Sequence, residues 1–286
     1  MTYEIWYRMY LETYKRNLAP KTRESYDQVT SRFILPAFGG QELRDVTPEH
    51  VQTAINAAAA RGGRQAQIVY AVIHAALRRA YRSQLIGFNP ADAIDKPGHD
   101  QEAGKALTAA DYAAASPLIG EELPLLLALD AGLRRGEIAG LQWGDVDLRA
   151  GMLHIRRQRS RAGGVLRVQP PKSRAGLRSV RMTPRLREQL RDVWQLRPTA
   201  FVVDLAPETI THRWSRLQEH LQLSDRYRLH DLRHTYGTRL ILGGVEPRVV
   251  QYLMGHSSLD VTMRVYSHCR AEDAFRALDR VYGSLH

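Results

Sequence analysis

Residues 90–106 divide this chain into two parts. The segment contains two prolines, two glycines and scattered charges, with few apolar side chains that could join a core. Such a composition is typical of a linker between domains. At 286 residues, of which 44% are hydrophobic, the chain is long enough for each part to have its own core. We therefore expect one domain at 1–89 and a second at 107–286.

Residues 2–88 have the pattern of a small helical bundle. Thr47 followed by Pro48 predicts a helix N-cap with proline in the first turn, and Gly62-Gly63 predicts the end of that helix. Apolar side chains recur at three- and four-residue spacing around residues 26–34 and again over 68–80. The first domain is therefore expected to be all helical.

The second part begins with a helical stretch after the predicted cap Thr108 and then changes character. Residues 154–156, 165–168 and 179–181 read as short strands separated by glycine-containing turns. We expect them to form one three-stranded antiparallel sheet. Helices are predicted again from Pro184, Pro207, Leu229, Glu246, Ser257 and Ala271. The expected fold class is mainly α with a small antiparallel β-sheet: a helical first domain and an α+β second domain.

The net charge of +11 comes from arginine, since 36 Arg and 5 Lys face 30 acidic residues. No Asp or Glu occurs between residues 151 and 187, whereas arginine recurs throughout. A solvated basic face, or a GC-rich genome, would also explain such a bias. We prefer a groove for DNA phosphates, since guanidinium grips phosphate with paired donors. The candidate DNA-binding residues are Arg156, Arg157, Arg159 and Arg174.

Two arginines could stabilise a reacting phosphate without a metal. A pentavalent phosphorus transition state gains negative charge, which fixed guanidinium groups meet with charge-assisted hydrogen bonds. Arg134 lies at a glycine-containing break between predicted helices, and Arg233 follows His230 by one helical turn. A surface salt bridge would explain either arginine alone. Glu137, one turn after Arg134, is expected to orient it or to cap a helix.

Tyr266 and Lys172 could supply a nucleophile and a proton donor. A free tyrosine has a pKa of about 10, so roughly one phenol in a thousand is ionised at neutral pH without help. Tyr266 lies between His256 and His268, although a packing role fits any single tyrosine. Lys172 is the only lysine after position 105. Burial among cations would lower its pKa and suit it to protonate a leaving 5′ oxygen, with chance retention as the alternative.

No cofactor and no metal is expected. His230, His234 and His256 could form a zinc site, but Asp231 replaces the glutamate of a His-Glu-x-x-His motif and Arg233 would repel the metal. A Walker-type glycine loop is missing from the sequence. One cysteine excludes an internal disulfide, and no apolar run is long enough to span a bilayer. We expect a soluble, cytoplasmic protein that does not bind membranes.

Four separated boxes resemble those of the tyrosine recombinases, or phage-type integrases. In chain order they are 131–143 around Arg134, 171–180 with Lys172, 230–235 with His230 and Arg233, and 253–268 with His256 and Tyr266. Their order and spacing make the resemblance more specific than any single box. It covers nearly the whole chain, with residues 2–88 similar to a helical core-site DNA-binding domain and residues 103–286 similar to a catalytic domain.

The resemblance implies site-specific recombination (integration) of DNA by transesterification. The nucleophile would attack the scissile phosphate, giving a 3′-phosphotyrosyl link and a free 5′ hydroxyl, without ATP or metal. The family's roles fall on Tyr266 as nucleophile, Arg134 and Arg233 as phosphate clamps, His230 as the group assisting proton removal, Lys172 as proton donor and His256 as a hydrogen-bonding group.

The resemblance also implies partners. We expect double-stranded DNA with a specific core site and a homotetramer on it, in which a C-terminal segment docks on a neighbour. An apolar stripe at 274–282 suits this docking, and packing on its own domain is the alternative. An accessory directionality factor and a nucleoid location in a bacterial cell, for a bacterial or phage-encoded protein, belong to the same expectation. By the same resemblance, we expect the sequence to begin at the core-binding domain, without an arm-site domain in front.

Two other functions are compatible with part of this set of residues. A type IB-like topoisomerase uses the same attack chemistry but acts as a monomer without site choice. A DNA-binding accessory protein that has lost catalysis would not need the full set of six catalytic candidates, which this sequence retains.

Overall fold

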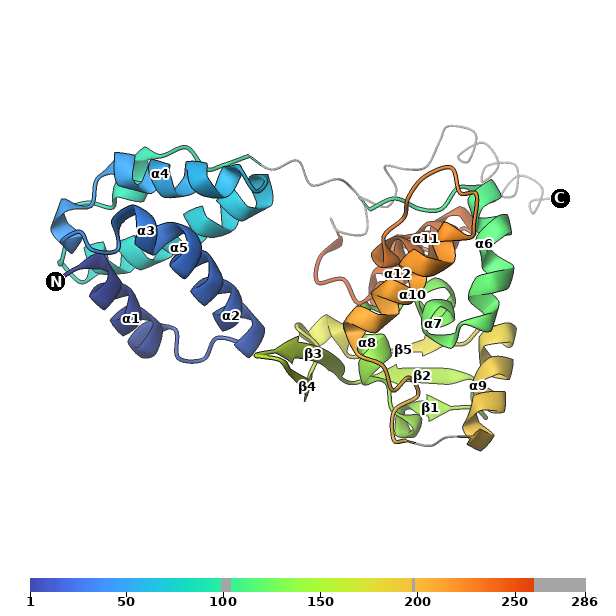
Figure 1. The fold of residues 1–286 in the computed structure, drawn as a ribbon. Helices are drawn as coiled ribbons and strands as arrows, with labels where there is room; N and C mark the ends of the chain where they lie inside the picture. The colour runs from blue at the N-terminus through green and yellow to red at the C-terminus, as the bar shows by residue number, and fades with distance from the viewer. Residues whose placement is uncertain (99–103, 197–198, 260–286) are drawn as a thin grey trace. The chain divides into compact units, whose positions relative to one another are not determined.

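The computed structural model describes residues 1–98, 104–196 and 199–259. The chain divides into two compact units, Met1–Glu102 and Ala103–His286, each with its own hydrophobic core (Figure 1). Both ends of the expected 90–106 linker belong to these units. Pro90–Ala93 forms a 3₁₀ turn whose Ala91 is buried in the first core. The backbone N–H of Lys105 donates to Asp231 in the second unit.

The first unit is helical, as predicted. Its core gathers around Trp6, whose indole N–H donates to the Ala76 carbonyl at 3.1 Å. A π-helical turn at Thr30–Ile34 joins two of the helices. The α-helices are α1 (Tyr3–Tyr14), α2 (Pro20–Val29), α3 (Leu35–Phe38), α4 (Pro48–Ala59) and α5 (Gly63–Arg82).

The cap predicted at Thr47 is confirmed. Its hydroxyl accepts the His50 backbone N–H at 3.4 Å, and the His50 ring nitrogen Nδ1 accepts the Thr47 backbone N–H at 3.2 Å. This reciprocal pair is a capping box, which satisfies donors that the first turn of a helix leaves free. Local sequence thus determined where α4 begins.

The second unit combines helices with short strands. The cap predicted at Thr108 is confirmed, because its hydroxyl accepts the Asp111 backbone N–H. The helices are α6 (Ala109–Glu121), α7 (Leu123–Ala131), α8 (Arg135–Gly140), α9 (Pro184–Leu196), α10 (Pro207–Glu219), α11 (Leu229–Leu242) and α12 (Pro247–Met254). The expected fold class, mainly α with small antiparallel sheets, is confirmed.

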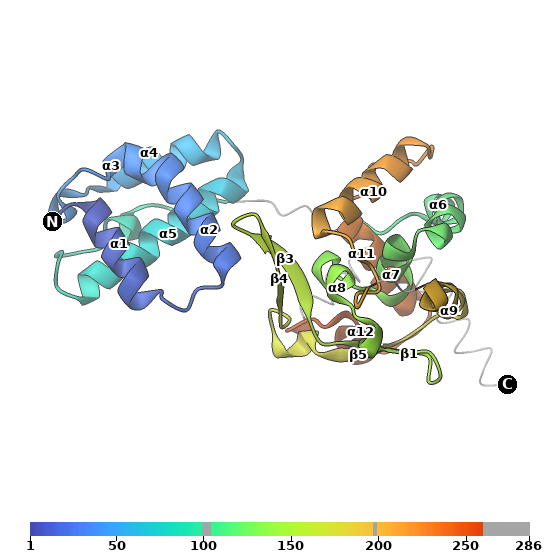
Figure 2. The ribbon, with the colours of Figure 1, turned by 60° about the horizontal axis from the view of Figure 1, so that its bottom comes forward.

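The strands form two separate sheets. In the larger one, β2 (Met152–Ile155) lies between β1 (Val146–Asp147) and β5 (Arg178–Arg181), antiparallel to both. In the other, β3 (Gln158–Ala162) and β4 (Val165–Gln169) form a hairpin, which Figure 2 shows extending from the body of this unit.

The prediction of one three-stranded sheet is therefore wrong in its pairing. Residues 165–168 pair with 158–162, immediately before the turn, and not with 154–156 or 179–181. The polar sequence Gln-Arg-Ser-Arg of β3 has no buried alternation by which a strand is recognised, so this partner was missed.

The centre of the second unit is α7, whose nine residues are all buried. It packs along α11, and both helices belong to the main core cluster (Figure 1). A helix buried on every side is largely apolar, which explains the Leu-rich sequence, and its one charged residue, Asp130, is paired with Arg185. Its C-terminal end and the length of α11 are thereby held next to each other.

Some predicted elements lie outside the described residues. These are the helix expected from Ser257, most of which follows residue 259, and the helix near Ala271. In residues 1–98, 104–196 and 199–259, no helix is both long enough and apolar enough to cross a bilayer.

A glycine sets the distance between α8 and β3. A Cβ on Gly140 would lie 2.7 Å from the Gln158 Cα and 2.8 Å from its carbonyl carbon, whereas a Cβ on Gly144 meets nothing within 4 Å. We expect Gly140→Ala to lower the free energy of unfolding by about 1–3 kcal/mol, because backbone cannot move aside as a side chain can. Gly144→Ala, the matched control, should change it little. Denaturant unfolding measures both, and equal values would contradict the close packing.

Candidate active site

Arg134 lies at the break between α7 and α8. Gly132 ends α7 in the left-handed conformation, with φ of 64°, and a Cβ there would lie 2.4 Å from the Tyr236 ring. Only glycine suits both conditions. Arg134 is then the N-cap residue of α8, and its side chain remains 36% exposed. The predicted position of this arginine, in a break between helices, is confirmed.

Glu137 both orients Arg134 and caps α8. One carboxylate oxygen accepts Nη1 of Arg134 at 2.7 Å, and the other accepts its backbone N–H at 2.9 Å. The side chain is 2% exposed. Burial raises the pKa of this carboxyl, but hydrogen bonds from Arg178 and the charges of Arg178, Arg134 and Arg233 outweigh that effect and lower it to about 2. Glu137 is therefore a buried anion.

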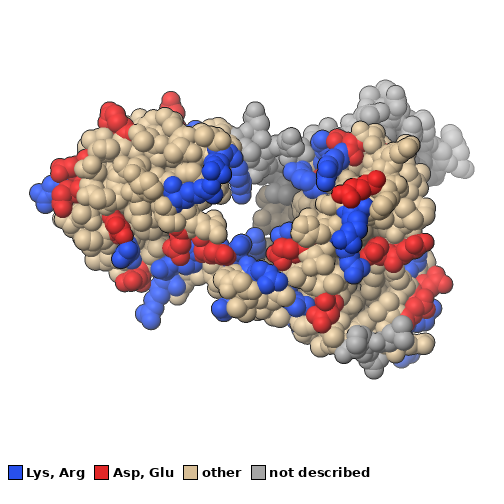
Figure 3. Space-filling view, viewed as in Figure 1, with Lys and Arg blue, Asp and Glu red and all other residues tan. Residues whose placement is uncertain are grey.

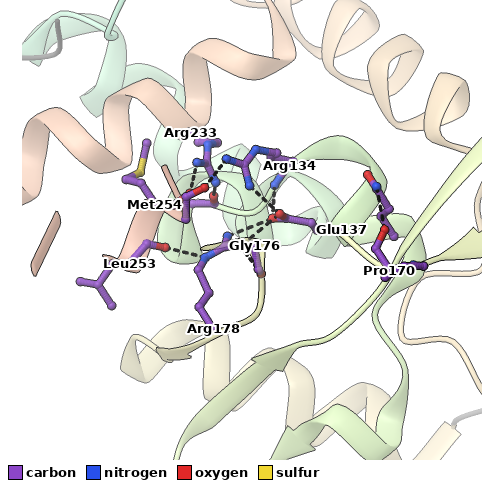
Figure 4. A network of polar contacts seen from close by, with 11 residues as sticks. Arg134, Glu137, Pro170, Gly176, Arg178, Arg233, Leu253 and Met254 are labelled. Atoms are coloured by element: carbon purple, nitrogen blue, oxygen red, sulfur yellow. Dashed lines mark hydrogen bonds and ion pairs between the residues drawn. The ribbon is translucent and has the colours of Figure 1, made fainter. Parts of the chain in front are cut away.

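Arg233 is buried within the second unit, at 1% exposure. It donates from Nη1 to the Gly132 carbonyl and from Nη2 to the Met254 carbonyl (Figure 4). Its Nε–H has no partner among the described residues. Burial, followed by the charge of Arg134, lowers its pKa, although arginine stays protonated in proteins. A buried cation with an unused donor favours the arrival of an anion.

His230 lies on α11, one turn before Arg233. Its ring contacts that of His234 edge to face, with centroids 4.8 Å apart. Desolvation, followed by the charges of His234 and Arg233, lowers the pKa of His230 to about 3. The residue as a whole is nevertheless exposed. It also lines a cavity of about 270 Å³ beside Arg135 and Arg228. At neutral pH the imidazole is uncharged and can accept a proton.

His256 follows the end of α12 and is 8% exposed. Burial, followed by the charges of Arg233 and Arg134, lowers its pKa to about 3, so this ring is also neutral. Gly255 before it adopts φ of 60° and packs tightly, since a Cβ there would lie 2.9 Å from the Ala175 carbonyl oxygen. The Gly255 carbonyl accepts Nη2 of Arg134 at 2.7 Å. Arg134, Arg233 and the residues before His256 thus meet.

Lys172 and Tyr266 are not part of this cluster as described. Lys172 is exposed in the segment between β4 and β5, so the burial expected for it is not seen in this structure. The predicted nucleophile Tyr266 lies outside the described residues, as does His268.

Sequence reasoning missed Arg178, at the start of β5. Its side chain is fully buried and forks onto Glu137, with Nη1 and Nη2 at 3.0 and 2.9 Å from the two carboxylate oxygens (Figure 4). In the sequence, Arg178 is one of many arginines in the acid-free segment, and nothing else there distinguishes it. Its partner is 41 residues away, and no local pattern links the two.

Much of the acid-free basic segment is neutralised by carboxylates from elsewhere in the fold. Arg157 pairs with Asp145 at 2.8 Å, and Arg159 pairs with Asp204 at 3.2 Å. Over the second unit in Figure 3, acidic side chains lie beside basic ones. Arg156 is 58% exposed and 3.7 Å from Asp145. The exposed cations without an ion pair to any described residue include Arg167, Lys172 and Arg174.

The zinc alternative required three ligands close together. Within the described ranges, no three His, Cys, Asp or Glu side chains are grouped so as to hold a metal ion.

The charge of Glu137 predicts a pH dependence of stability. Its pKa falls from 4.5 to about 2 on folding, so the stabilisation is complete above about pH 4.5 and is lost as the pH falls toward 2. We expect Glu137→Gln to unfold more easily than wild type at pH 7, by on the order of 3 kcal/mol. The difference should shrink by pH 3. Denaturant unfolding at a series of pH values measures it, and a constant difference would contradict the assignment.

Comparison with known proteins identifies the family. The family model described as Phage integrase family matches residues 100–273, and a second model, Phage integrase, N-terminal SAM-like domain, matches residues 2–58. Tyrosine recombinase XerC of Pelobacter propionicus is 27% identical over 302 residues, which cover 96% of this chain and 93% of that protein.

Solved structures share the fold. The integrase of transposon Tn1549, in complex with a circular intermediate DNA, matches with a TM-score of 0.82 and 20% identity over 98% of this chain and 99% of that one. Lambda integrase, as a tetramer bound to a Holliday junction, matches with a TM-score of 0.68 and 21% identity over 90% of this chain and 78% of that one. Because the first family model spans more than half of the sequence, the chain belongs to the phage integrase family and is a tyrosine-type site-specific DNA recombinase.

Proposed function

We propose that this chain cuts and rejoins DNA at a specific core site through a 3′-phosphotyrosyl intermediate. The observation that carries the proposal is the cluster of arginines around the buried Glu137 carboxylate. Arg134, Arg178 and Arg233 contribute three positive charges and Glu137 one negative charge, which leaves a net charge of +2 beside two neutral histidines. A phosphodiester carries one negative charge, and its pentavalent transition state carries two. The cluster thus matches the transition state better than the substrate.

The bond changes balance without an external reactant. The Tyr266 phenolate oxygen forms a bond to phosphorus, and the bond from phosphorus to the 5′ oxygen breaks. Neutral His230 takes the phenol proton, and Lys172 gives a proton to the leaving 5′ oxygen. The phosphotyrosyl link keeps the energy of the ester. A 5′ hydroxyl from a partner strand reverses the step and rejoins the DNA.

The N–H groups of Arg134, Arg233 and His256 suit them to bind the scissile phosphate. Arg134 is partly exposed and Arg233 has an unused Nε–H, so both can reach the non-bridging oxygens of a phosphate. Neutral His256 offers one ring N–H to the same group. The negative charge of the bound phosphate raises the pKa of His230, which makes it a better base when DNA is present.

The assembly is part of the proposal. Lambda integrase forms a tetramer on a Holliday junction, and we propose a homotetramer on double-stranded DNA for this chain. The C-terminal stripe at 274–282 lies outside the described residues, so exchange of that segment stays a prediction. So do an accessory directionality factor, a cytoplasmic location at the nucleoid, and core-site binding by the helical unit. The recombinase and integrase relatives favour this function over a type IB-like topoisomerase.

The covalent intermediate tests the reaction. The Tyr266→Phe protein first selects a binding duplex from a randomised pool, and that duplex is then nicked near the cleavage point so that the short 5′ fragment diffuses away. Wild type should accumulate a protein–DNA adduct on a denaturing gel, because rejoining is blocked. Tyr266→Phe should form none. An adduct of equal yield with Tyr266→Phe would exclude this tyrosine as nucleophile.

The unpaired cations predict a salt dependence. A cation that neutralises one DNA phosphate adds about 1 to the slope of log affinity against log salt. We expect Arg174→Ala to weaken binding to the selected duplex and to reduce this slope by about 1. Arg213, an exposed arginine on α10 that pairs with Glu122, provides the control. Fluorescence anisotropy at several salt concentrations measures both, and equal slopes for Arg174→Ala and wild type would remove Arg174 from the interface.

A further inference from the structure

Arg178 joins three parts of the second unit. Its Nη1 and Nη2 bind the Glu137 carboxylate of α8, its Nε donates to the Leu253 carbonyl of α12 at 2.7 Å, and Nη1 also donates to the Gly176 carbonyl at 3.2 Å. Four of its five N–H groups are engaged and the side chain is 0% exposed. Its hydrogen bonds are therefore committed to the protein, whereas Arg233 donates to only two carbonyls of the described residues.

The end of α12 is held by arginine. Leu253, Met254 and Gly255 are consecutive. The Leu253 and Met254 carbonyls accept donors from Arg178 and Arg233 (Figure 4), and the Gly255 carbonyl accepts one from Arg134. The last carbonyls of a helix lack partners within it, and cations near this end are favourable. The next residue is His256, and Tyr266 follows ten positions later.

These arginines differ in what they can do when DNA binds. Arg134 is 36% exposed, and the Nε–H of Arg233 has no partner among the described residues, so in the proposed function both can share their hydrogen bonds between α12 and a phosphate. Arg178 has neither exposure nor a fully free guanidinium face. We expect it to stay on α12 and Glu137 when a phosphate binds, because leaving would strand the buried Glu137 carboxylate.

The same side chain holds the segment that carries Lys172. Gly176, whose carbonyl Arg178 binds, packs against Pro171, since a Cβ on Gly176 would lie 2.4 Å from the Pro171 Cβ. Pro171 precedes Lys172 directly. Gly255, after the end of α12, packs on the same guanidinium, because a Cβ on Gly255 would lie 3.1 Å from Nη1 of Arg178. The lysine segment and the end of α12 are thus both packed on one guanidinium.

We propose that Arg178 is a positioning residue for strand cleavage, which fixes the ends of α12 and of the Lys172 segment relative to Arg134 without touching DNA. This inference rests on the proposed function. A lysine in its place keeps the charge but not the planar fork, so it loses the simultaneous hold on Glu137, Leu253 and Gly176. Displacements of about 1 Å in a reacting site reduce rates by on the order of a hundredfold.

The test compares Arg178→Lys with Arg185→Lys. Arg185 forks onto Asp130 at 2.5 and 2.7 Å in the same unit but outside the site, so its variant controls for loss of an arginine–carboxylate fork. With the selected nicked duplex at saturation, we expect Arg178→Lys to form adduct about a hundredfold more slowly than wild type, with unchanged DNA affinity. Arg185→Lys should cleave like wild type.

A substrate with a different leaving group tests the effect of Arg178 on the Lys172 segment separately from its effect on the end of α12. A duplex with sulfur at the scissile 5′ bridging position needs no proton donor, so it should largely restore cleavage by Lys172→Ala. It should restore Arg178→Lys only in part, because the end of α12 is still displaced. Complete restoration would overturn the claim for α12, and no restoration would overturn the claim for the Lys172 segment.

Stability is checked by denaturant unfolding of each variant. If Arg178→Lys does not fold, Glu137→Gln combined with Arg178→Met removes both buried charges together, which avoids an unpaired carboxylate. This double variant should bind DNA, and it should cleave DNA more slowly than the Glu137→Gln variant alone. Wild-type rates for the Arg178 variants, or DNA affinity that falls in parallel with cleavage, would overturn the inference. Absence of a wild-type adduct would instead overturn the proposed function.

Discussion

The buried Glu137 carboxylate is the interaction on which the rest of the site depends. Its two oxygens accept donors from the Arg134 side chain, the Arg134 backbone and the Arg178 fork. Without this anion, the buried guanidinium groups of Arg178 and Arg233 would lie close to each other and to the partly exposed Arg134, where like charges repel. With it, α8, α12 and β5 are tied to one point. The cations are then available to a phosphate at a fixed geometry.

The arginine cluster and the end of α12 are already joined in the structure, which contains no DNA. Arg134, Arg178 and Arg233 bind the three last carbonyls of the α12 region, and the neighbouring cations help to lower the pKa of both His230 and the buried His256. In the proposed function, a phosphate that binds here would meet oriented donors and an excess of positive charge. Electrostatic stabilisation of this kind needs little reorganisation during the reaction, which is where a preorganised site gains over water.

The basic segment shows how burial changes the meaning of a charge pattern. In the sequence, residues 151–187 contain no acid and many arginines, which favoured a continuous DNA-binding surface. In the fold, Asp145, Asp204 and Glu137 neutralise several of those arginines from outside the segment. Arg174 and Arg167 remain exposed and have no such partner among the residues that the structure describes. A run of like charges predicts a charged binding partner only through those side chains that form no ion pairs within the fold.

The sequence by itself determined the features that depend on neighbouring residues. Caps at Thr47 and Thr108, the break at Gly132 and the order of the four boxes are local signals, and they located the helices, the chemistry and the family. Only the tertiary structure decided that 165–168 pairs with β3, that Lys172 is exposed, and that Arg178 is the buried partner of Glu137. These properties depend on which atoms meet across long stretches of chain and on what is removed from water. Hydrogen-bond partners and burial at that range follow from packing, which local spacing does not specify.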